Sequence, residues 1–459
     1  MAAVFEVERP AIDDDYDVLA DFTDLLTDTT DDSTVTIFSD NKMLNGSMLP
    51  RTEAAENSNS ESELSFTTAA SNSGMWDEDA CAMEDDFQKA YYRYIPPVET
   101  APNTEPSPQP SNITSRVIYP RIETMHWAPV DVPLERRLQT AACTYFIWLF
   151  IAAPFVTPVI ALYVLFFTSY WWISALYAIW FAYDWHSPER GAYAQEWFRR
   201  QRVWEYLAAY FPAKLVKTID LDPNENYIIG GHPHGILAIS SFISICTEAT
   251  GWSDIFPGIS SHLVTLGSQF MSPIRREMIL MCGIISSNKR AIEYLLGKDD
   301  KKGKAVTIIL GGAEEALDCR PDSHILRLSM RKGFVRLALE NGAHLVPMFN
   351  FGENKTYRQV ENNHGTKLRT FQTKFKEYFG FSPPLFMGRG IFNYSFGLLP
   401  FRTNITSVVG APIKVTKIPK PTPEEIDELH AKYCDALRHL FDENKLKYGL
   451  SEDSHLTIL

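Results

Sequence analysis

The stretch Tyr227-Ile-Ile-Gly-Gly-His-Pro-His-Gly235 joins a short apolar run to a loop that carries two histidines. The apolar run is typical of a buried strand, and the glycines together with Pro233 predict that the strand ends in a loop. A helical stretch is predicted to follow as far as Cys246. A strand, a loop and a helix in this order indicate an α/β domain, in which reactive groups gather at the carboxyl ends of parallel strands.

The rest of the C-terminal half continues this alternation. Strands are predicted at 305–310 and 344–349, and a helix at 331–341 is expected to stop at Gly342. Near the end of the chain, Thr422-Pro-Glu-Glu425 has the N-cap, the proline and the acidic residue of a helix start. The apolar residues that follow it at helical spacing are Ile426, Leu429, Tyr433, Leu437 and Leu440. We therefore predict an α/β fold with a mostly parallel sheet flanked by helices.

A long apolar segment precedes this domain. Residues 138–183 contain no charged side chain. Crossing a bilayer takes about 20 apolar residues, so the segment has room for two short passes. Arginines stand on both sides of it, which favours both ends on the cytosolic side. We predict a transmembrane or re-entrant hydrophobic hairpin, and a buried pair of soluble helices is the alternative reading.

The N-terminal quarter of the chain differs sharply in charge from the rest. Residues 1–110 hold 24 acidic and 5 basic residues, so they carry −19 of a chain whose net charge is −14. This composition predicts a disordered acidic tail, and its charge disfavours binding of nucleic acid. The predicted organisation is an acidic tail (1–115), a linker (116–137), the hydrophobic hairpin (138–183), a cytosol-facing domain (184–449) and a C-terminal tail (450–459).

The strongest candidates for chemistry are His232 and His234. Histidine titrates near pH 6.5, so it can take a proton from a hydroxyl group at neutral pH. The His-x-His spacing also suits a metal, but no cluster of Cys or carboxylates supplies further ligands, and we predict no metal site. A purely structural pair of histidines remains the other alternative. The six cysteines are widely spaced, which argues against a disulfide framework.

Nine short motifs widen this view beyond the histidines. In order along the chain they are Tyr210-Phe-Pro212, His232-Pro-His-Gly235, Phe256-Pro-Gly-Ile259, Gly311-Gly-Ala-Glu-Glu315, Arg331-Lys-Gly-Phe-Val-Arg336, Leu345-Val-Pro347, Phe351-Gly-Glu-Asn354, Gly388-Arg-Gly390 and Val409-Gly-Ala-Pro412. Together they closely resemble the type 2 diacylglycerol acyltransferase family, which includes monoacylglycerol and wax-alcohol acyltransferases. The resemblance runs from about Trp172 to Gly449 and leaves out the acidic tail.

The resemblance implies transfer of an acyl group from acyl-CoA to the hydroxyl of a glyceride, at the endoplasmic reticulum membrane and on lipid droplets. It makes His234 the general base and gives His232 a supporting role. No cofactor is expected, since acyl-CoA is a co-substrate. The implied partners are acyl-CoA, diacylglycerol, the bilayer and the droplet surface. A homo-oligomer is compatible with the sequence, although no pattern specifies one.

The group that orients the His234 ring is left open by the sequence. Related glycerol-phosphate acyltransferases carry an Asp five positions after the catalytic His, whereas this chain has Ile239 there. The candidate carboxylates, each of which follows a predicted strand within a matching motif, are Glu314, Glu315 and Glu353. A structural or surface role for these carboxylates is the alternative.

Two further roles are expected around the reacting atoms. The backbone N–H of Gly235, at the predicted helix start, is a candidate donor to the oxyanion of the tetrahedral intermediate. The candidates for binding the CoA phosphates are Arg331, Lys332, Gly333 and Arg336, at the start of the predicted 331–341 helix. A solvated basic helix start is the alternative for this group.

The acceptor is not fixed by these residues. Lys445-Leu-Lys-Tyr-Gly449 and Thr247-Glu-Ala-Thr250 look more like the branch of the family that acts on diacylglycerol. An enzyme with monoacylglycerol or a long-chain alcohol as acceptor keeps the same chemistry. A lipid-droplet scaffold without activity is the reading from another class, and the intact His-Pro-His-Gly sequence stands against it.

Overall fold

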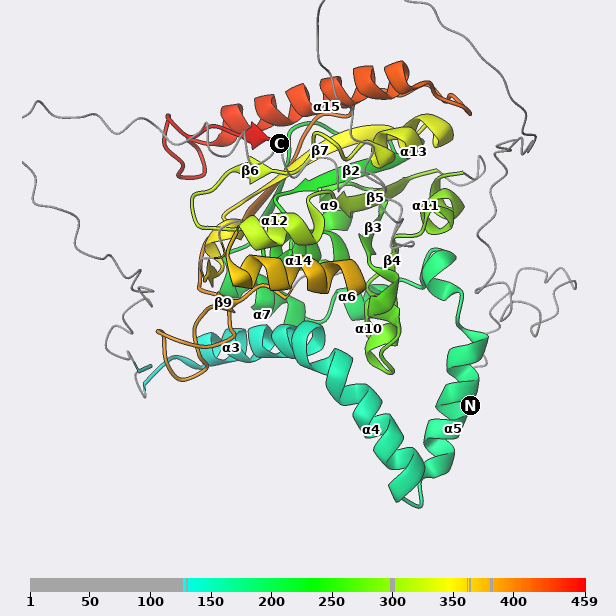
Figure 1. Ribbon diagram of the computed structural model, residues 1–459, viewed down its shortest axis with the longest axis vertical. Coiled ribbons are helices and arrows are strands. Elements are labelled where there is room, and N and C mark those ends of the chain that lie inside the picture. Colours follow the sequence, from blue (N-terminus) through cyan, green and yellow to red (C-terminus); the bar gives the residue numbers. More distant parts are fainter. Residues whose placement is uncertain (1–126, 129–130, 298–301, 361, 363–364, 380–382) are drawn as a thin grey trace, which may run out of the picture. The chain divides into compact units, whose positions relative to one another are not determined.

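A computed structural model describes residues 127–128, 131–297, 302–360, 362, 365–379 and 383–459. The predicted acidic tail and most of the predicted linker lie outside the described residues. Within them the fold is mixed α/β, with one main sheet and helices on both of its faces (Figure 1).

The main sheet has seven strands in the order β1-β10-β7-β2-β5-β3-β4. Their bounds are β1 (Lys214–Lys217), β2 (Tyr227–His232), β3 (Ser260–Thr265), β4 (Ile284–Ser286), β5 (Lys304–Ile309), β7 (His344–Phe351) and β10 (Thr406–Val409). The five strands from β7 to β4 run parallel, and β10 runs antiparallel to β7. Two small pairs accompany the sheet, β6 (Ile325–Leu326) with β11 (Thr457–Ile458) and β8 (Arg358–Gln359) with β9 (Phe386–Met387). The prediction of a mostly parallel sheet is confirmed.

Each face of the sheet packs against its own apolar cluster. Along β2, Tyr227 and Ile229 belong to one cluster and Ile228 to the other, as the alternation of side chains in a strand requires. Helices that pack on the first face are α3 (Leu134–Ile147), α7 (Arg202–Tyr210), η3 (Phe242–Cys246) and α10 (Arg275–Met281). Helices that pack on the second face are α11 (Lys289–Leu296), α13 (Gly333–Asn341) and α15 (Pro423–Asn444).

The remaining helices are short or lie outside these two layers. They are η1 (Trp148–Ala152), α4 (Ala153–Phe167), α5 (Trp171–Tyr183), η2 (Ser187–Glu189), α6 (Glu196–Arg199), α8 (Ile239–Ser241), α9 (Trp252–Ile255), η4 (Gly267–Phe270), α12 (Gly312–Asp318), η5 (Glu353–Lys355) and α14 (Lys367–Phe379).

The predicted ends of two helices are confirmed in detail. The Thr422 hydroxyl accepts a hydrogen bond from the Glu425 N–H, and the Glu425 carboxylate accepts one from the Thr422 N–H, so α15 begins with a complete capping box. At the end of α13, Gly342 has a φ of +70°, the left-handed conformation that stops a helix.

The helix after the two histidines begins later than the sequence suggested. Gly235 and Ala238 have φ values of +63° and +51°, so the chain turns twice before α8 begins at Ile239. The segment 233–238 between β2 and α8, which we call the histidine loop, therefore projects from the end of β2 before the chain returns to the layer of helices.

The long apolar segment divides into two parts with different environments. The continuous helical run Leu134–Phe167 is long and apolar enough to cross a membrane. Its first part, α3, packs against α7 and buries Cys143 and Phe146 in the domain core. By contrast, α4 and α5 pack on each other, extend away from the sheet and expose most of their large apolar side chains (Figure 1). The residues predicted as one hairpin over 138–183 thus include a stretch that belongs to the domain.

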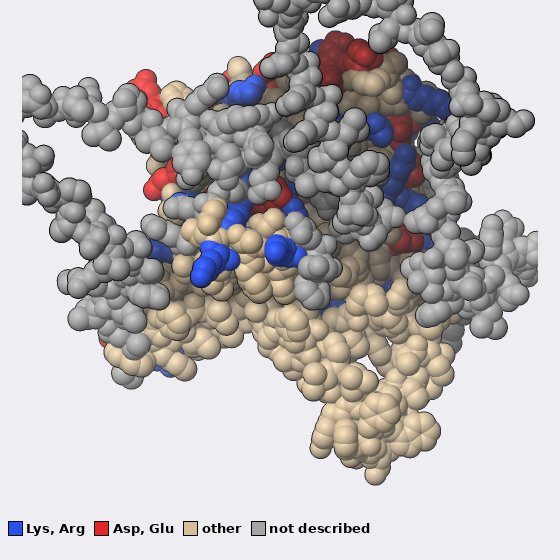
Figure 2. Space-filling view, in the orientation of Figure 1, with Lys and Arg blue, Asp and Glu red and all other residues tan. Residues whose placement is uncertain are grey.

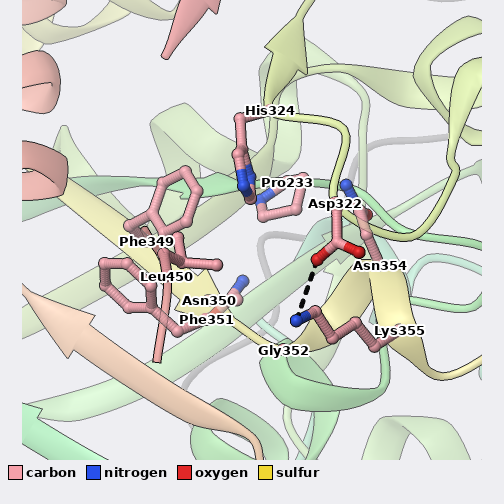
Figure 3. Close-up of a pocket in the computed structure, with 10 residues that line it drawn as sticks. All are labelled: Pro233, Asp322, His324, Phe349, Asn350, Phe351, Gly352, Asn354, Lys355 and Leu450. Carbon is pink, nitrogen blue, oxygen red and sulfur yellow. Dashed lines mark ion pairs between the residues drawn. The ribbon is translucent and has the colours of Figure 1, made fainter. Parts of the chain in front are cut away.

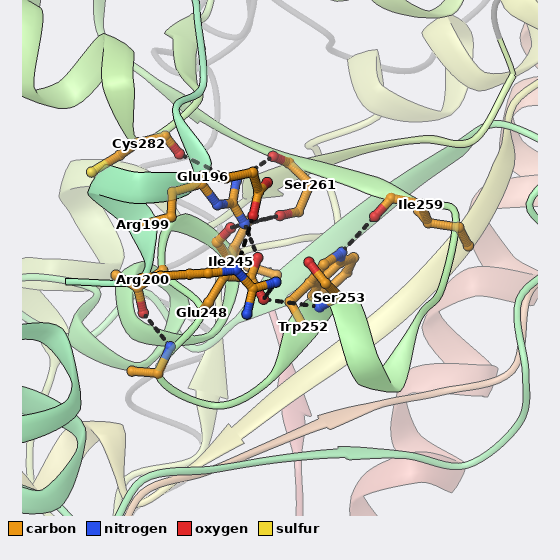
Figure 4. Close-up of polar contacts among 12 residues, drawn as sticks. Glu196, Arg199, Arg200, Ile245, Glu248, Trp252, Ser253, Ile259, Ser261 and Cys282 are labelled. Atoms are coloured by element: carbon orange, nitrogen blue, oxygen red, sulfur yellow. Dashed lines mark hydrogen bonds and ion pairs between the residues drawn. The ribbon is translucent and has the colours of Figure 1, made fainter. Parts of the chain in front are cut away.

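A buried ion pair fastens α6 to the segment that follows the histidine loop. Arg199 Nη2 lies 3.2 Å from Glu248 Oε1, and their side chains are only 4% and 2% exposed. The same guanidinium donates to the carbonyl of Ile245 at the end of η3 and to the hydroxyl of Ser261 in β3 (Figure 4). Because every one of these groups is removed from water, the network holds three elements in one arrangement.

Candidate active site

The carboxyl ends of three neighbouring strands bring the candidate residues together. The order of these strands in the sheet is β7-β2-β5. His234 follows β2, Glu315 lies in α12 directly after β5, and Glu353 lies in η5 directly after β7. Parallel strands end at one edge of the sheet, so residues far apart in sequence meet around the histidine loop.

The imidazole of His234 is half-buried and is held by its own neighbour. Its Nδ1 lies 3.0 Å from the carbonyl oxygen of Gly235. A carbonyl can only accept, so Nδ1 carries the hydrogen and Nε2 keeps a lone pair. Among the described residues, none bonds to Nε2. Burial lowers the pKa of His234, which keeps the ring neutral at pH 7.

Glu315 holds the backbone of the histidine loop and not its ring. One carboxylate oxygen accepts from the His234 N–H at 2.5 Å, and the other accepts from the Arg327 N–H at 3.2 Å. Burial raises the pKa of Glu315 to about 7, although the two N–H donors favour the charged form. The carboxylate therefore bridges two loops that the sequence separates widely.

Glu353 fixes the other end of the same loop. It is fully buried, and its carboxylate accepts from the N–H groups of Ile239 and Ser240 at 3.0 and 2.8 Å and from the Ser240 hydroxyl. Burial raises the pKa of Glu353 above its ordinary value. A Cβ at Gly235 would come within 2.5 Å of Glu353 Cγ, so only glycine fits between this carboxylate and the loop at that φ.

Glu314 points elsewhere. Its carboxylate pairs with Arg327 at 3.0 Å and with Lys376 of α14. Burial alone would raise the pKa of Glu314, but these two cations outweigh it and hold the pKa at about 2. Of the three candidate carboxylates, two reach the backbone of the histidine loop and none bonds to the His234 ring. The group that orients the His234 ring is the backbone carbonyl of Gly235. A backbone group cannot be predicted from the pattern of side chains in the sequence.

His232 is completely buried, and it bonds to Tyr433, a residue that the sequence analysis placed only on an apolar helix face. Its Nε2 lies 3.0 Å from the hydroxyl of Tyr433 on α15, and that hydroxyl donates to the carbonyl of Gly230 at 3.2 Å. The hydroxyl has one hydrogen, so Nε2–H of His232 must be the donor to it. Burial lowers the pKa of His232 to about 3, so the ring stays neutral and supports the loop from behind.

Removing the hydroxyl at Tyr433 tests this support. In Tyr433→Phe, the His232 N–H and the Gly230 carbonyl lose their partner in a dry environment, and we expect the free energy of unfolding to fall by about 1–3 kcal/mol. Tyr448→Phe is the matched control, because the buried Tyr448 hydroxyl has no hydrogen-bond partner among the described residues. Equal melting temperatures for the two variants would contradict the role given to Tyr433.

The basic residues predicted to meet CoA lie at the start of α13, on the same edge of the sheet. The ring of Phe334, in the first turn of α13, packs 4.9 Å from the ring of Tyr433, which reaches His232. Lys332 forms an ion pair with Asp427 at 2.7 Å, and Arg336 is exposed. Gly333 is the first residue of the helix. The start of α13 is thus connected to His232 through Phe334 and Tyr433, and the role of the basic group in binding stays a prediction.

The structure shows no arrangement of the two histidines that suits a shared metal ion. The His232 and His234 rings turn to different partners, Tyr433 and Gly235. Within the described residues, no group of three or more His, Cys, Asp or Glu side chains is placed to hold a metal ion.

Comparison with known proteins places this site in a family. A family model described as diacylglycerol acyltransferase matches residues 163–459. The 2-acylglycerol O-acyltransferase 1 of Bos taurus is 43% identical over 332 residues, which cover 72% of this chain and 98% of that protein. The diacylglycerol O-acyltransferase 2 of Danio rerio is 44% identical over 326 residues, which cover 71% of this chain and 90% of that protein.

Among solved structures, the 1-acyl-sn-glycerophosphate acyltransferase PlsC from Thermotoga maritima matches 69% of this chain and 99% of its own length, at 11% identity and a TM-score of 0.32. The sequence relatives are far more similar to this chain, and their matches extend over nearly their whole length. The resemblance carried by the nine motifs is therefore confirmed, and the chain belongs to the diacylglycerol acyltransferase family.

Proposed function

We propose that this protein transfers an acyl group from acyl-CoA to the free hydroxyl of diacylglycerol, forming triacylglycerol and free CoA. The observation that carries the proposal is the His234 ring, which is neutral, is held through Nδ1 and has a lone pair at Nε2. In a family of acyltransferases, such a ring is suited to take a proton from an alcohol.

The proposed reaction follows from the weakness of an alcohol as a nucleophile. As the acceptor oxygen attacks the thioester carbon, its proton passes to His234 Nε2. The C–S bond of the tetrahedral intermediate then breaks, and the departing thiolate of CoA takes the proton from the imidazolium. The Gly235 N–H makes no hydrogen bond within the described residues, so it remains our candidate for stabilising the oxyanion. The reaction needs no cofactor besides the co-substrate.

The choice of acceptor is the finer part of the proposal. Relatives named for diacylglycerol and for 2-acylglycerol match this chain at 44% and 43% identity, so overall identity favours neither. The segments 247–250 and 445–449 support diacylglycerol by their resemblance. Acylation of a 2-acylglycerol is the second candidate, since that bovine relative matches over 98% of its length.

Competition between acceptors in one vessel tests the choice. The purified protein is given labelled oleoyl-CoA with equimolar diacylglycerol, 2-monoacylglycerol and hexadecanol, and the lipid products are separated. We expect triacylglycerol to form first and fastest. Diacylglycerol or wax ester as the main initial product would move the protein to another acceptor and keep the proposed chemistry, and no labelled product from any acceptor would contradict the reaction itself.

Among the basic residues at the start of α13, Arg331 is the one whose removal we expect to weaken the binding of acyl-CoA most. A charge-assisted hydrogen bond to a phosphate contributes about 1.5–3 kcal/mol, so Arg331→Ala is expected to raise the KM for acyl-CoA about tenfold or more. Arg438→Ala is the matched control, because Arg438 is an exposed arginine of α15 that pairs with Asp435. An unchanged KM in a folded Arg331→Ala enzyme would contradict the assignment.

We further propose how the protein meets the membrane. α4 and α5 have 15 and 13 residues, fewer than the 20 or so that cross a bilayer. They are joined by a tight turn at Thr168-Ser-Tyr170, and in Figure 2 the pair shows no charged side chain on the face in view. Entry into one leaflet and return on the same side fits these lengths and keeps both ends cytosolic. The endoplasmic reticulum and lipid droplets are the proposed membranes.

A second apolar surface lies in a loop beside the first half of α3. In the loop after β9, the side chains of Phe392, Phe396 and Leu398 are 72%, 61% and 53% exposed, and the loop contains no acidic residue. Backbone hydrogen bonds between 388–389 and 397–399 hold it in shape. Arg402, just beyond it, bonds to Gln139 of α3 at 2.6 Å. Exposed aromatic side chains on a loop that is held in shape suit contact with lipid.

Site-directed labelling tests this arrangement. An environment-sensitive fluorophore is attached to a cysteine introduced at Phe167, at Phe396 or, as the control, at Arg438 on the opposite face of the sheet. We expect lipids that carry a quencher in the acyl chain to quench the first two labels and to leave the control unchanged. Quenching at Phe167 alone would contradict the contact of the loop, and quenching at neither site would contradict both contacts.

A further inference from the structure

The last residues of the chain form a strand beside the active site. β11 pairs in parallel with β6, with Thr457 opposite Ile325 and Ile458 opposite Leu326. The Thr457 N–H donates to the His324 carbonyl at 2.9 Å, and the Leu459 N–H donates to the Leu326 carbonyl at 2.8 Å. The Leu459 carbonyl in turn accepts from the N–H groups of Leu328 and Ser329, each at 2.9 Å.

The opposite edge of β6 faces the histidine loop. Successive backbone groups of a strand alternate in direction, so the groups of residues 324, 326 and 328 meet β11 while the N–H of Arg327 points the other way. That N–H donates to Glu315, whose second oxygen accepts from the His234 N–H. A continuous series of backbone and carboxylate hydrogen bonds therefore connects the end of the chain to His234.

The segment between α15 and β11 also packs behind the histidine loop. Leu450, His324 and Pro233 line a small pocket together with Phe349 of β7 (Figure 3). Across the same pocket, Asp322 and Lys355 form an ion pair at 2.9 Å. The residues around β6 thus share a pocket with Pro233 of the histidine loop and are bonded to that loop through Glu315.

We propose that β11 is a positioning element of the active site: by pairing with β6 it aims the Arg327 N–H at Glu315, and Glu315 then fixes the backbone of His234. The Arg327 guanidinium is held separately, by ion pairs with Asp318 and Glu314 at 2.7 and 3.0 Å. Those ion pairs fix the side chain, whereas the direction of the N–H follows from the strand. β6 has only two residues, and β11 is its partner in a two-stranded sheet.

The consequence of losing β11 is local. Leu326 and Leu328 stay buried in the core on the second face of the sheet, and the residues lost from that core, Leu456 and Ile458, are only partly buried, so the domain keeps most of its apolar packing. Glu315 loses a donor that favours its charged form and so becomes a weaker acceptor for the His234 N–H. A shift of the loop by about 1 Å is enough to lower the rate by a large factor, because the base must meet the acceptor hydroxyl in a narrow range of positions.

Three single substitutions in the full chain test the proposal. Thr457→Pro removes the N–H that bonds to His324, whereas Thr457→Ala keeps it. His455→Pro is the matched proline control, since neither the backbone N–H nor the imidazole of the exposed His455 has a hydrogen-bond partner among the described residues. In Thr457→Pro we expect kcat to fall about tenfold or more, with little change in the KM for acyl-CoA or in the melting temperature. The other two variants are expected to match the wild type.

Hydrogen exchange gives a readout that does not depend on the reaction. Because the His234 N–H donates to Glu315, we expect a peptide covering 230–240 to exchange faster in Thr457→Pro and to be unchanged in Thr457→Ala. Unchanged exchange in Thr457→Pro would overturn the proposal, as would an equal loss of kcat in His455→Pro. The expected loss of kcat rests on the proposed acyl transfer. If the wild-type protein showed no acyl transfer but Thr457→Pro still exchanged faster, the support by β11 would stand and only the proposed function would be contradicted.

Discussion

His234→Ala is expected to lower kcat for acyl transfer by about 10²- to 10⁴-fold, the usual contribution of a general base. The reason is specific to the geometry: Nδ1 is committed to the Gly235 carbonyl, and Nε2 is the one ring atom left to receive the proton of the acceptor. The substitution leaves the Glu315 bond intact, since it uses the His234 backbone N–H. We therefore expect the loss of rate without a matching loss of folded protein.

Two comparisons make that measurement specific. His455→Ala removes an exposed imidazole near the end of the chain and is expected to leave kcat unchanged. His232→Ala removes a buried ring that bonds to Tyr433, so we expect it to lower the melting temperature as well as the rate. A His234→Ala enzyme that keeps its rate when expressed and folded at the level of the wild type would show that another group takes the proton.

Arg199→Ala is expected to give the largest loss of stability. It leaves the buried Glu248 carboxylate with only a more distant ion partner, Arg200 at 3.9 Å, and breaking a buried pair in this way costs about 3–5 kcal/mol. For a domain of this size, that loss corresponds to a fall in melting temperature of roughly 10 °C. The Ile245 and Ser261 groups that bond to the guanidinium also lose a partner, which adds to the effect.

The neighbouring arginine provides the control. Arg200 is half-exposed. It pairs with the exposed Glu196 and reaches Glu248 only at 3.9 Å, beyond hydrogen-bond distance, so Arg200→Ala is expected to change the free energy of unfolding by about 1 kcal/mol or less. The double variant Arg199→Met/Glu248→Leu removes both charges and is expected to be more stable than Arg199→Ala. If Arg199→Ala melted at the temperature of Arg200→Ala, the network would not hold α6 to η3 as described.

The elements that the sequence predicts well are those determined by neighbouring residues. The strand that begins at Tyr227-Ile-Ile and the capping box at Thr422 depend on a few adjacent positions, and both appear where expected, although the strand runs on to His232. α3 shows where such reasoning stops. An uncharged helix looks the same in sequence whether its apolar side meets lipid or protein, and the packing of Phe146 in the core depends on α7, some 60 residues away.

The active site follows the same division. The histidine loop is formed by neighbouring residues, so the motif predicts both the loop and its chemistry. Its supports come from residues 81 and 114 positions away, at Glu315 and Glu353, and 201 positions away, at Tyr433. Motifs singled out both glutamates, but which atom each carboxylate meets depends on the order β7-β2-β5 in the sheet. Tyr433 appeared only as a member of an apolar helix face, where its hydroxyl was the one sign of a polar role.

The pH dependence of kcat/KM for diacylglycerol tests most directly that neutral His234 is the base. Burial lowers the pKa of His234 below its ordinary 6.5, so the active, unprotonated ring is present above that pKa and is lost as the pH falls through it. In the wild type we predict a rate that falls as the pH falls, with the Glu315 carboxyl, whose pKa is about 7, contributing near neutrality. In Glu315→Gln this carboxyl no longer titrates, and we predict a plateau above pH 6.5 and a fall below it. A rate that instead declines as the pH rises through neutrality would mean that the protonated imidazole is the active form and would contradict the account.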